Sequence, residues 1–220
     1  MTSESHPAAI AIDGPAASGK STVGRALAHE LGYKFLDTGL MYRAFTLAAQ
    51  RAGIPATKEA CAPFASALDM RLGDEPDAHI YLGDEDVTAL LHDPGIEGQV
   101  SAYSAIPVVR EVLRAAQRDF AGRGKTVLAG RDIGAVVLPG APLKIYLEAD
   151  EPARARRRSA QRGISAEAHA REAHQDLSRR DRLDSPQTSI APGAVVIDTT
   201  ALTLEQVIAR VFEKVRCPAS

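Results

Sequence analysis

The chain has 220 residues and a formal net charge of −2, with 45% hydrophobic and 25% charged residues. This is ordinary globular composition, and the length suits one α/β domain that carries insertions. The charge gives no case for a nucleic-acid partner, and two widely separated cysteines suggest no disulfide framework or metal cluster. The polar residues 1–7 and the lack of a membrane-length apolar run predict a cytoplasmic protein with no membrane partner.

The first predicted elements are a buried strand, a glycine-rich loop and a helix. Residues 8–12 are apolar, and residues 14–21 (GPAASGKS) match the phosphate-binding pattern G-x-x-x-x-G-K-[ST] at every fixed position. The helix is predicted from apolar residues spaced four apart, at Val23, Leu27 and Leu31. In this order the helix dipole and its unpaired N–H groups point at a bound phosphate. We therefore expect a nucleoside triphosphate site with Lys20 on the β- and γ-phosphates and Ser21 on Mg²⁺.

Strands and helices then alternate along the chain, as a doubly wound parallel sheet requires. Strands are predicted at 33–36, 126–129, 143–147 and 194–197. Helices are predicted at 39–52, 58–68, 101–119 and 203–215, and an arginine-rich helix begins at Pro152. Asp37 and Thr38 can cap the helix at 39–52. The expected apolar face of the helix at 101–119 contains Val108, Val112 and Ala115 or Ala116.

One interval, from about residue 63 to residue 99, interrupts this alternation. Residues 70–72 and 79–82 have the pattern of short antiparallel strands separated by polar turns. We interpret the interval as an inserted subdomain that stands off the main sheet.

Three features outside the loop indicate what receives the phosphate. Thr38 and Tyr42 lie four residues apart on one side of a helix. Arg131 and Asp132 directly follow a buried strand, so they face the crevice at the carboxyl edge of the sheet. The arginines of residues 154–182 can neutralise a phosphoryl group during transfer. Each feature also has a purely structural explanation: a partly buried tyrosine, an Arg131–Asp132 pair, and solvent-exposed arginines.

Three motifs resemble those of the bacterial cytidylate kinase family: residues 10–15 (IAIDGP), 36–43 (LDTGLMYR) and 130–134 (GRDIG). The resemblance extends over nearly the whole chain. It implies an α/β fold, with a P-loop NTPase core of a five-stranded parallel sheet flanked by helices, an enlarged inserted acceptor-nucleotide subdomain and a short lid. It implies one kinase domain over 1–220, an acceptor-nucleotide region at 38–110 that includes the insert, and a lid at 152–185.

The resemblance also implies an activity. An enzyme of this family transfers the γ-phosphate of ATP to CMP or dCMP, giving CDP or dCDP and ADP, and requires Mg²⁺. This reaction belongs to pyrimidine nucleotide metabolism. Nothing in the sequence demands more than a monomer.

Site residues follow from the same resemblance. The ATP phosphates would be held by Gly14, Pro15, Ala16, Ala17, Ser18, Gly19, Lys20, Ser21 and Thr22, and the metal by Ser21. The acceptor phosphate would be held by Thr38, Tyr42, Arg43 and Arg131, the cytosine edge by Ser101, Arg110 and Asp132, and the ribose by Arg180 and Asp184. The catalytic set would be Lys20, Arg131, Arg157 and Arg158, with Arg154 and Arg162 also in the lid.

The chain departs from the family pattern at Gln187, where the family usually has an arginine three residues after the aspartate that matches Asp184. Glutamine can form hydrogen bonds but has no charge. Either a neighbouring arginine such as Arg182 substitutes for it or acceptor binding is weaker.

Three alternatives remain at this point. A kinase for another small acceptor, such as UMP, AMP or shikimate, shares the loop and the fold. A regulatory GTPase usually needs an N-K-x-D motif, and this chain contains no asparagine. A nucleotide-binding module without catalysis is disfavoured by the intact Lys20 and Ser21.

Overall fold

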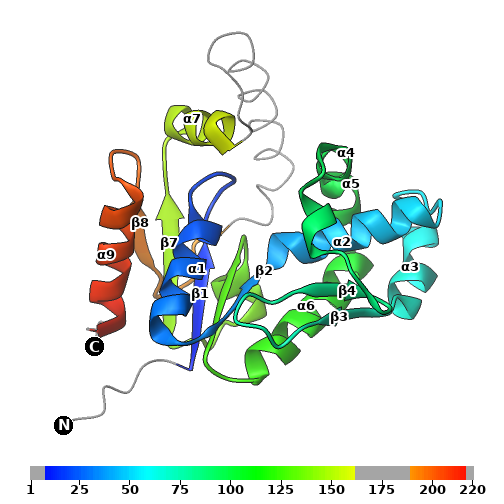
Figure 1. Ribbon diagram of the computed structural model, residues 1–220, viewed down its shortest axis with the longest axis horizontal. Helices are drawn as coiled ribbons and strands as arrows, with labels where there is room; N and C mark the ends of the chain where they lie inside the picture. The colour runs from blue at the N-terminus through cyan, green and yellow to red at the C-terminus, as the bar shows by residue number, and fades with distance from the viewer. Residues whose placement is uncertain (1–7, 162–188, 217–220) are drawn as a thin grey trace.

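The computed structural model describes residues 8–161 and 189–216. Its centre is a parallel sheet of five strands in the order β2-β6-β1-β7-β8 (Figure 1). The strands are β1 (Ala9–Asp13), β2 (Lys34–Asp37), β6 (Thr126–Gly130), β7 (Leu143–Glu148) and β8 (Val195–Asp198). The predicted five-stranded parallel sheet is confirmed, and each strand begins and ends within one residue of its predicted bounds.

Helices cover both faces of this sheet, because successive side chains of a strand point to opposite sides. The covering helices are α1 (Lys20–Leu31), α2 (Thr38–Arg51), α6 (Pro107–Gly122) and α9 (Leu204–Arg216). Ile10 and Ile12 of β1 pack with α1 and α9 in one buried cluster. Ala11, between them, belongs to a second cluster with α2 and α6. The phosphate loop after β1 therefore starts from the middle of the core.

The insert forms a second, smaller sheet, in the antiparallel order β3-β4-β5. Its elements are α3 (Lys58–Ala67), β3 (Met70–Leu72), β4 (Ile80–Leu82), β5 (Glu85–Asp86), the 3₁₀ helix η1 (Thr88–His92) and α4 (Pro94–Glu97). The insert is also attached to the main sheet. Phe35 N on the edge strand β2 donates to Pro76 O at 2.7 Å, and Ala78 N donates to Phe35 O at 2.9 Å. The expectation that the insert stands off the main sheet therefore misses this contact.

The helix predicted at 101–119 is two helices, α5 (Val100–Ser104) and α6. Pro107 disfavours the helical conformation for the residue before it, and Ile106 accordingly has φ −80° and ψ 120°. The predicted apolar face of α6 is wrong by one position, because Val109, Leu113 and Phe120 are buried, whereas Val108 and Val112 are only partly buried. This rotation turns Arg110 into the protein interior, where it is 8% exposed.

Two elements lie near the ends of the central strands. The π-helical turn η2 (Ile133–Val137), which the sequence did not predict, follows β6, and α7 (Glu151–Gln161) follows β7. Pro152 stands in the first turn of α7, as predicted. Within the described ranges, every helix is too short or too polar to cross a lipid bilayer. Residues 162–188, which include most of the predicted lid, lie outside the described residues.

Candidate active site

The phosphate loop connects the end of β1 to the start of α1, as predicted. Gly14 and Gly19 have positive φ values of 154° and 96°, and Ala17 also has a positive φ, of 58°. At Gly14 a Cβ atom would lie 2.3 Å from the carbonyl oxygen of Leu147, so the loop passes directly against β7. Lys20 is the first residue of α1, and its Nζ donates to Pro15 O at 2.8 Å. The lysine is therefore folded over the loop it belongs to.

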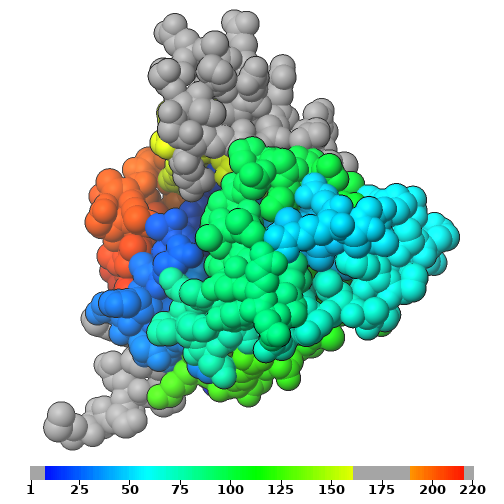
Figure 2. Space-filling model, turned by 45° about the vertical axis from the view of Figure 1, so that its right-hand side comes forward, coloured from blue at the N-terminus to red at the C-terminus, as the bar shows by residue number. Residues whose placement is uncertain are grey.

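A cavity of about 820 Å³ lies between this loop, the start of α2 and the end of β6. The predicted site residues that line it are Ala16, Ala17, Gly19, Lys20, Ser21, Thr22, Thr38, Tyr42, Arg43, Arg110, Arg131, Asp132 and Arg158. Donor-side and acceptor-side residues thus line one cavity. In the space-filling view the insert (cyan to green) lies beside α1 (blue), and α9 (orange to red) lies on the opposite side of α1 (Figure 2).

Other predicted residues lie elsewhere. Gly14, Pro15 and Ser18 belong to the loop without lining the cavity, and Ser101 and Arg157 are not among the described residues that line it. Arg162, Arg180, Asp184 and Gln187 lie outside the described residues.

Arg43 is held at the acceptor side by the insert. Its guanidinium donates to Leu91 O at 3.0 Å and to Glu97 Oε1 at 3.2 Å. The same Glu97 oxygen also contacts Arg158 of α7. Glu97 is 7% exposed and lines the cavity, so one buried carboxylate connects the acceptor side to α7. Sequence reasoning missed Glu97, and no local spacing marks it.

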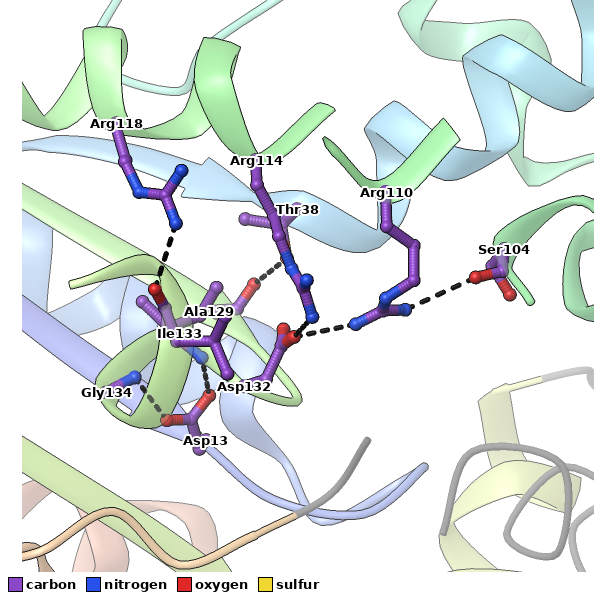
Figure 3. A network of polar contacts seen from close by, with 11 residues as sticks. Asp13, Thr38, Ser104, Arg110, Arg114, Arg118, Ala129, Asp132, Ile133 and Gly134 are labelled. Atoms are coloured by element: carbon purple, nitrogen blue, oxygen red, sulfur yellow. Dashed lines mark hydrogen bonds and ion pairs between the residues drawn. The ribbon is translucent and has the colours of Figure 1, made fainter. Parts of the chain in front are cut away.

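Asp132 is the centre of a second network (Figure 3). Its Oδ2 accepts from Arg110 at 2.6 Å and from Arg114 at 2.5 Å. Arg110 also lies over the Tyr42 ring, at 5.7 Å from its centroid, and burial raises the pKa of Tyr42 above its usual value. Arg114 was missed, although arginines at 110, 114 and 118 recur at the spacing of one helix face.

Asp13, at the end of β1, connects the phosphate loop to η2. Its two carboxylate oxygens accept from Ile133 N and Gly134 N, each at 2.7 Å (Figure 3). Burial raises the pKa of Asp13 to about 6, and the negative charge of Asp132 acts in the same direction, whereas the two hydrogen bonds and Lys20 oppose the shift. Sequence reasoning gave Asp13 no role.

Replacing Asp13 with asparagine should change how stability depends on pH. Since the pKa is about 6 in the folded state against an ordinary 3.8, the folded chain retains a proton there that the unfolded chain has lost. This contribution to stability is complete below the unfolded pKa and is lost as pH rises through about 6. From about pH 5 to about pH 7 the free energy of unfolding of the wild type should fall by roughly 1–1.5 kcal/mol more than that of Asp13→Asn. Urea unfolding at both pH values measures this difference, and an equal fall in the variant would contradict the prediction.

The arginines of α7 fall into two groups. Arg154 donates to Ala149 O at 3.1 Å and to Ala16 O at 3.3 Å, and Arg157 donates to Thr199 O and to Ser18 O at 2.5 and 3.5 Å. These two side chains therefore hold backbone carbonyls of the phosphate loop from outside the cavity wall. Arg158 lines the cavity itself. The catalytic role of Arg157 stays a prediction.

The chain is similar in sequence to known proteins. The family model described as "Cytidylate kinase" matches residues 10–217. The chain is 47% identical to a cytidylate kinase of Mycolicibacterium paratuberculosis over 94% of both chains. It is 42% identical to one of Roseiflexus castenholzii, over 98% of this chain and 97% of that protein. A gluconokinase structure from Sinorhizobium meliloti is 20% identical with a TM-score of 0.48, covering 98% of this chain and 99% of that one.

Proposed function

The chain belongs to the cytidylate kinase family, and from that premise we propose that its cavity is where ATP and CMP or dCMP meet. The enzyme is an ATP-dependent nucleoside monophosphate kinase that gives CDP or dCDP and ADP. One observation carries the assignment of the site: the phosphate loop and the acceptor-side residues Arg43, Arg131 and Asp132 line the same cavity. Family membership also decides against a regulatory GTPase.

The donor end of the proposed site is the phosphate loop. Residues 14–22 would surround the ATP phosphates with backbone N–H groups at the start of α1, where the helix dipole favours an anion. Lys20 would follow the β- and γ-phosphates from its position at the loop.

The acceptor end would hold CMP by its phosphate and by its base. Thr38, Tyr42, Arg43 and Arg131 would bind the phosphate, and Ser101, Arg110 and Asp132 would bind the cytosine edge. Thr38 is already oriented, because its Oγ1 donates to Ala129 O at 2.9 Å. Arg180 and Asp184, which would bind the ribose, are outside the described residues.

The chemistry proposed for this cavity needs no general base. The acceptor phosphate is already an anion, so the enzyme must align it with the γ-phosphate and neutralise the charge of the group in transfer. Lys20, Arg131 and Arg158 line the cavity and can supply that positive charge. Arg157 would contribute by supporting the loop at Ser18 O.

Ser21 is the residue we propose for Mg²⁺. It lines the cavity, and its hydroxyl makes no hydrogen bond within the described residues, so its oxygen is available to a cation that prefers oxygen ligands. When bound, the ion would neutralise charge on the β- and γ-phosphates. A cytoplasmic location, a monomeric state and the domain bounds 38–110 and 152–185 stay predictions.

Initial rates with a panel of acceptors test the proposal. With ATP fixed, kcat/KM measured from ADP release should be highest with CMP and dCMP and lower with UMP and AMP. The reaction without acceptor is the control for ATP hydrolysis. A clear preference for AMP or for a non-nucleotide acceptor would contradict it.

A further inference from the structure

The two ion pairs of Asp132 share one oxygen. Arg110 and Arg114 both donate to Oδ2, whereas Oδ1 has no hydrogen-bond partner in the described part of the chain. The Asp132 side chain is 8% exposed, and the residue lines the cavity. The carboxylate is thus held from one side, and its second oxygen remains available to a ligand.

The two arginines are not equivalent. Arg110 also donates to Ser104 O at 3.3 Å and lies over the Tyr42 ring. Arg114 makes no hydrogen bond within residues 8–161 and 189–216 other than the one to Asp132, and its buried Nε has no partner. Among the described residues, the Arg114 guanidinium therefore forms hydrogen bonds with the Asp132 carboxylate alone.

A carboxylate held in this way can distinguish the two common pyrimidines. It accepts hydrogen bonds and donates none. Cytosine presents an exocyclic amine, a donor, where uracil presents a carbonyl, an acceptor. An amine can bond to Oδ1, while a carbonyl placed there leaves two acceptors facing each other without a proton between them.

We propose that Arg114 is a positioning residue that, with Arg110, holds Asp132 by Oδ2 and leaves Oδ1 to accept from the amine of cytosine. Arg114 thereby sets the preference for cytidine over uridine monophosphates without touching the base. This inference rests on the proposed function, in which Asp132 binds the cytosine edge.

The chain offers a matched control on the same helix. Arg118 lies one turn beyond Arg114, and in Figure 3 its guanidinium lies away from Asp132. It donates instead to the carbonyls of Val136 and Val137, both at 3.1 Å. Substitution of either arginine removes a charge and a contact between α6 and the segment after β6. Of these two arginines, Arg114 contacts the Asp132 carboxylate and Arg118 does not.

The test measures kcat/KM with CMP and with UMP for five proteins: wild type, Arg114→Met, Arg114→Lys, Arg118→Met and Asp132→Asn. Arg114→Met should lower the CMP to UMP ratio about tenfold, mainly through a higher KM for CMP. Arg118→Met should leave the ratio within about twofold. Arg114→Lys, which retains one charged donor, should recover part of the ratio. Thermal unfolding of each variant shows whether it is folded.

The outcomes distinguish the positioning role of Arg114 from the base-binding role of Asp132. A lower ratio in Asp132→Asn with an unchanged ratio in Arg114→Met would overturn the role of Arg114 and leave the base-binding role of Asp132 standing. An unchanged ratio in Asp132→Asn would overturn that role and this inference with it. An equal fall with both acceptors in Arg114→Met and Arg118→Met would show that the arginines are structural, which also overturns the inference.

Discussion

Replacing Lys20 with methionine is expected to lower turnover roughly a thousandfold and to leave the fold intact. Lys20 lines the cavity, and its Nζ is held 2.8 Å from Pro15 O in the phosphate loop. Methionine keeps an unbranched stem but removes the charge that would follow the phosphoryl group during transfer. ADP release at saturating ATP and CMP measures the effect, and the thermal unfolding midpoint reports on the fold.

Lys144 supplies a matched control. Its Nζ also donates to a proline carbonyl, Pro192 O at 3.3 Å, but it is not among the residues that line the cavity. Lys144→Met should therefore retain turnover within about twofold. If Lys20→Met turned over within about tenfold of the wild type, the lysine would have no part in charge neutralisation.

Replacing Gly14 with alanine should lower the free energy of unfolding by about 3–5 kcal/mol and abolish ATP binding. The new Cβ would lie 2.3 Å from Leu147 O and 2.8 Å from Ser18 Oγ, and the backbone there has φ +154°. The Leu147 oxygen belongs to a central strand and cannot move without disturbing the sheet. Urea unfolding and ATP titration of the folded variant check both effects.

Gly124 separates backbone strain from the steric clash. It also has a positive φ, +76°, but a Cβ there would meet no atom of the described residues within 4 Å. In Gly124→Ala the free energy of unfolding should therefore fall only by the strain of the left-handed conformation, about 1–2 kcal/mol. If both variants lost the same free energy of unfolding, the steric clash with Leu147 would contribute nothing to the effect at Gly14.

Features with a local cause were predictable from the sequence. The glycine pattern and the apolar residues before it specify a strand, a loop and a helix within one short stretch. Asp37 caps α2 as predicted, because its side chain accepts from Gly39 N two residues away. The parallel sheet followed from the alternation of strands and helices. None of these predictions depended on which distant segment packs against the element.

Features that depend on distant partners were not predictable. Asp13 is joined to residues 133 and 134, and Glu97 is joined to Arg43 and Arg158, across long stretches of chain. The break in the helix before Pro107 did have a local signal, the proline itself. The rotation of the buried face of α6 by one position did not, because it depends on which of its residues the neighbouring elements cover. The resemblance to a family supplied the site residues around Asp132 but not Arg114, which the helical spacing alone would have placed beside Arg110.

The strand order has a consequence for how the nascent chain acquires its nucleotide site. β1 and β2 leave the ribosome before the other strands of the sheet, yet they are not neighbours in it, because β6 lies between them. β1 pairs with β6 and β7, which begin at Thr126 and Leu143. A polypeptide released before Thr126 would contain every residue of the phosphate loop and no strand for β1 to pair with. The phosphate loop is translated before β6 and β7, and it can thus bind nucleotide only after the codons for those later strands have been read.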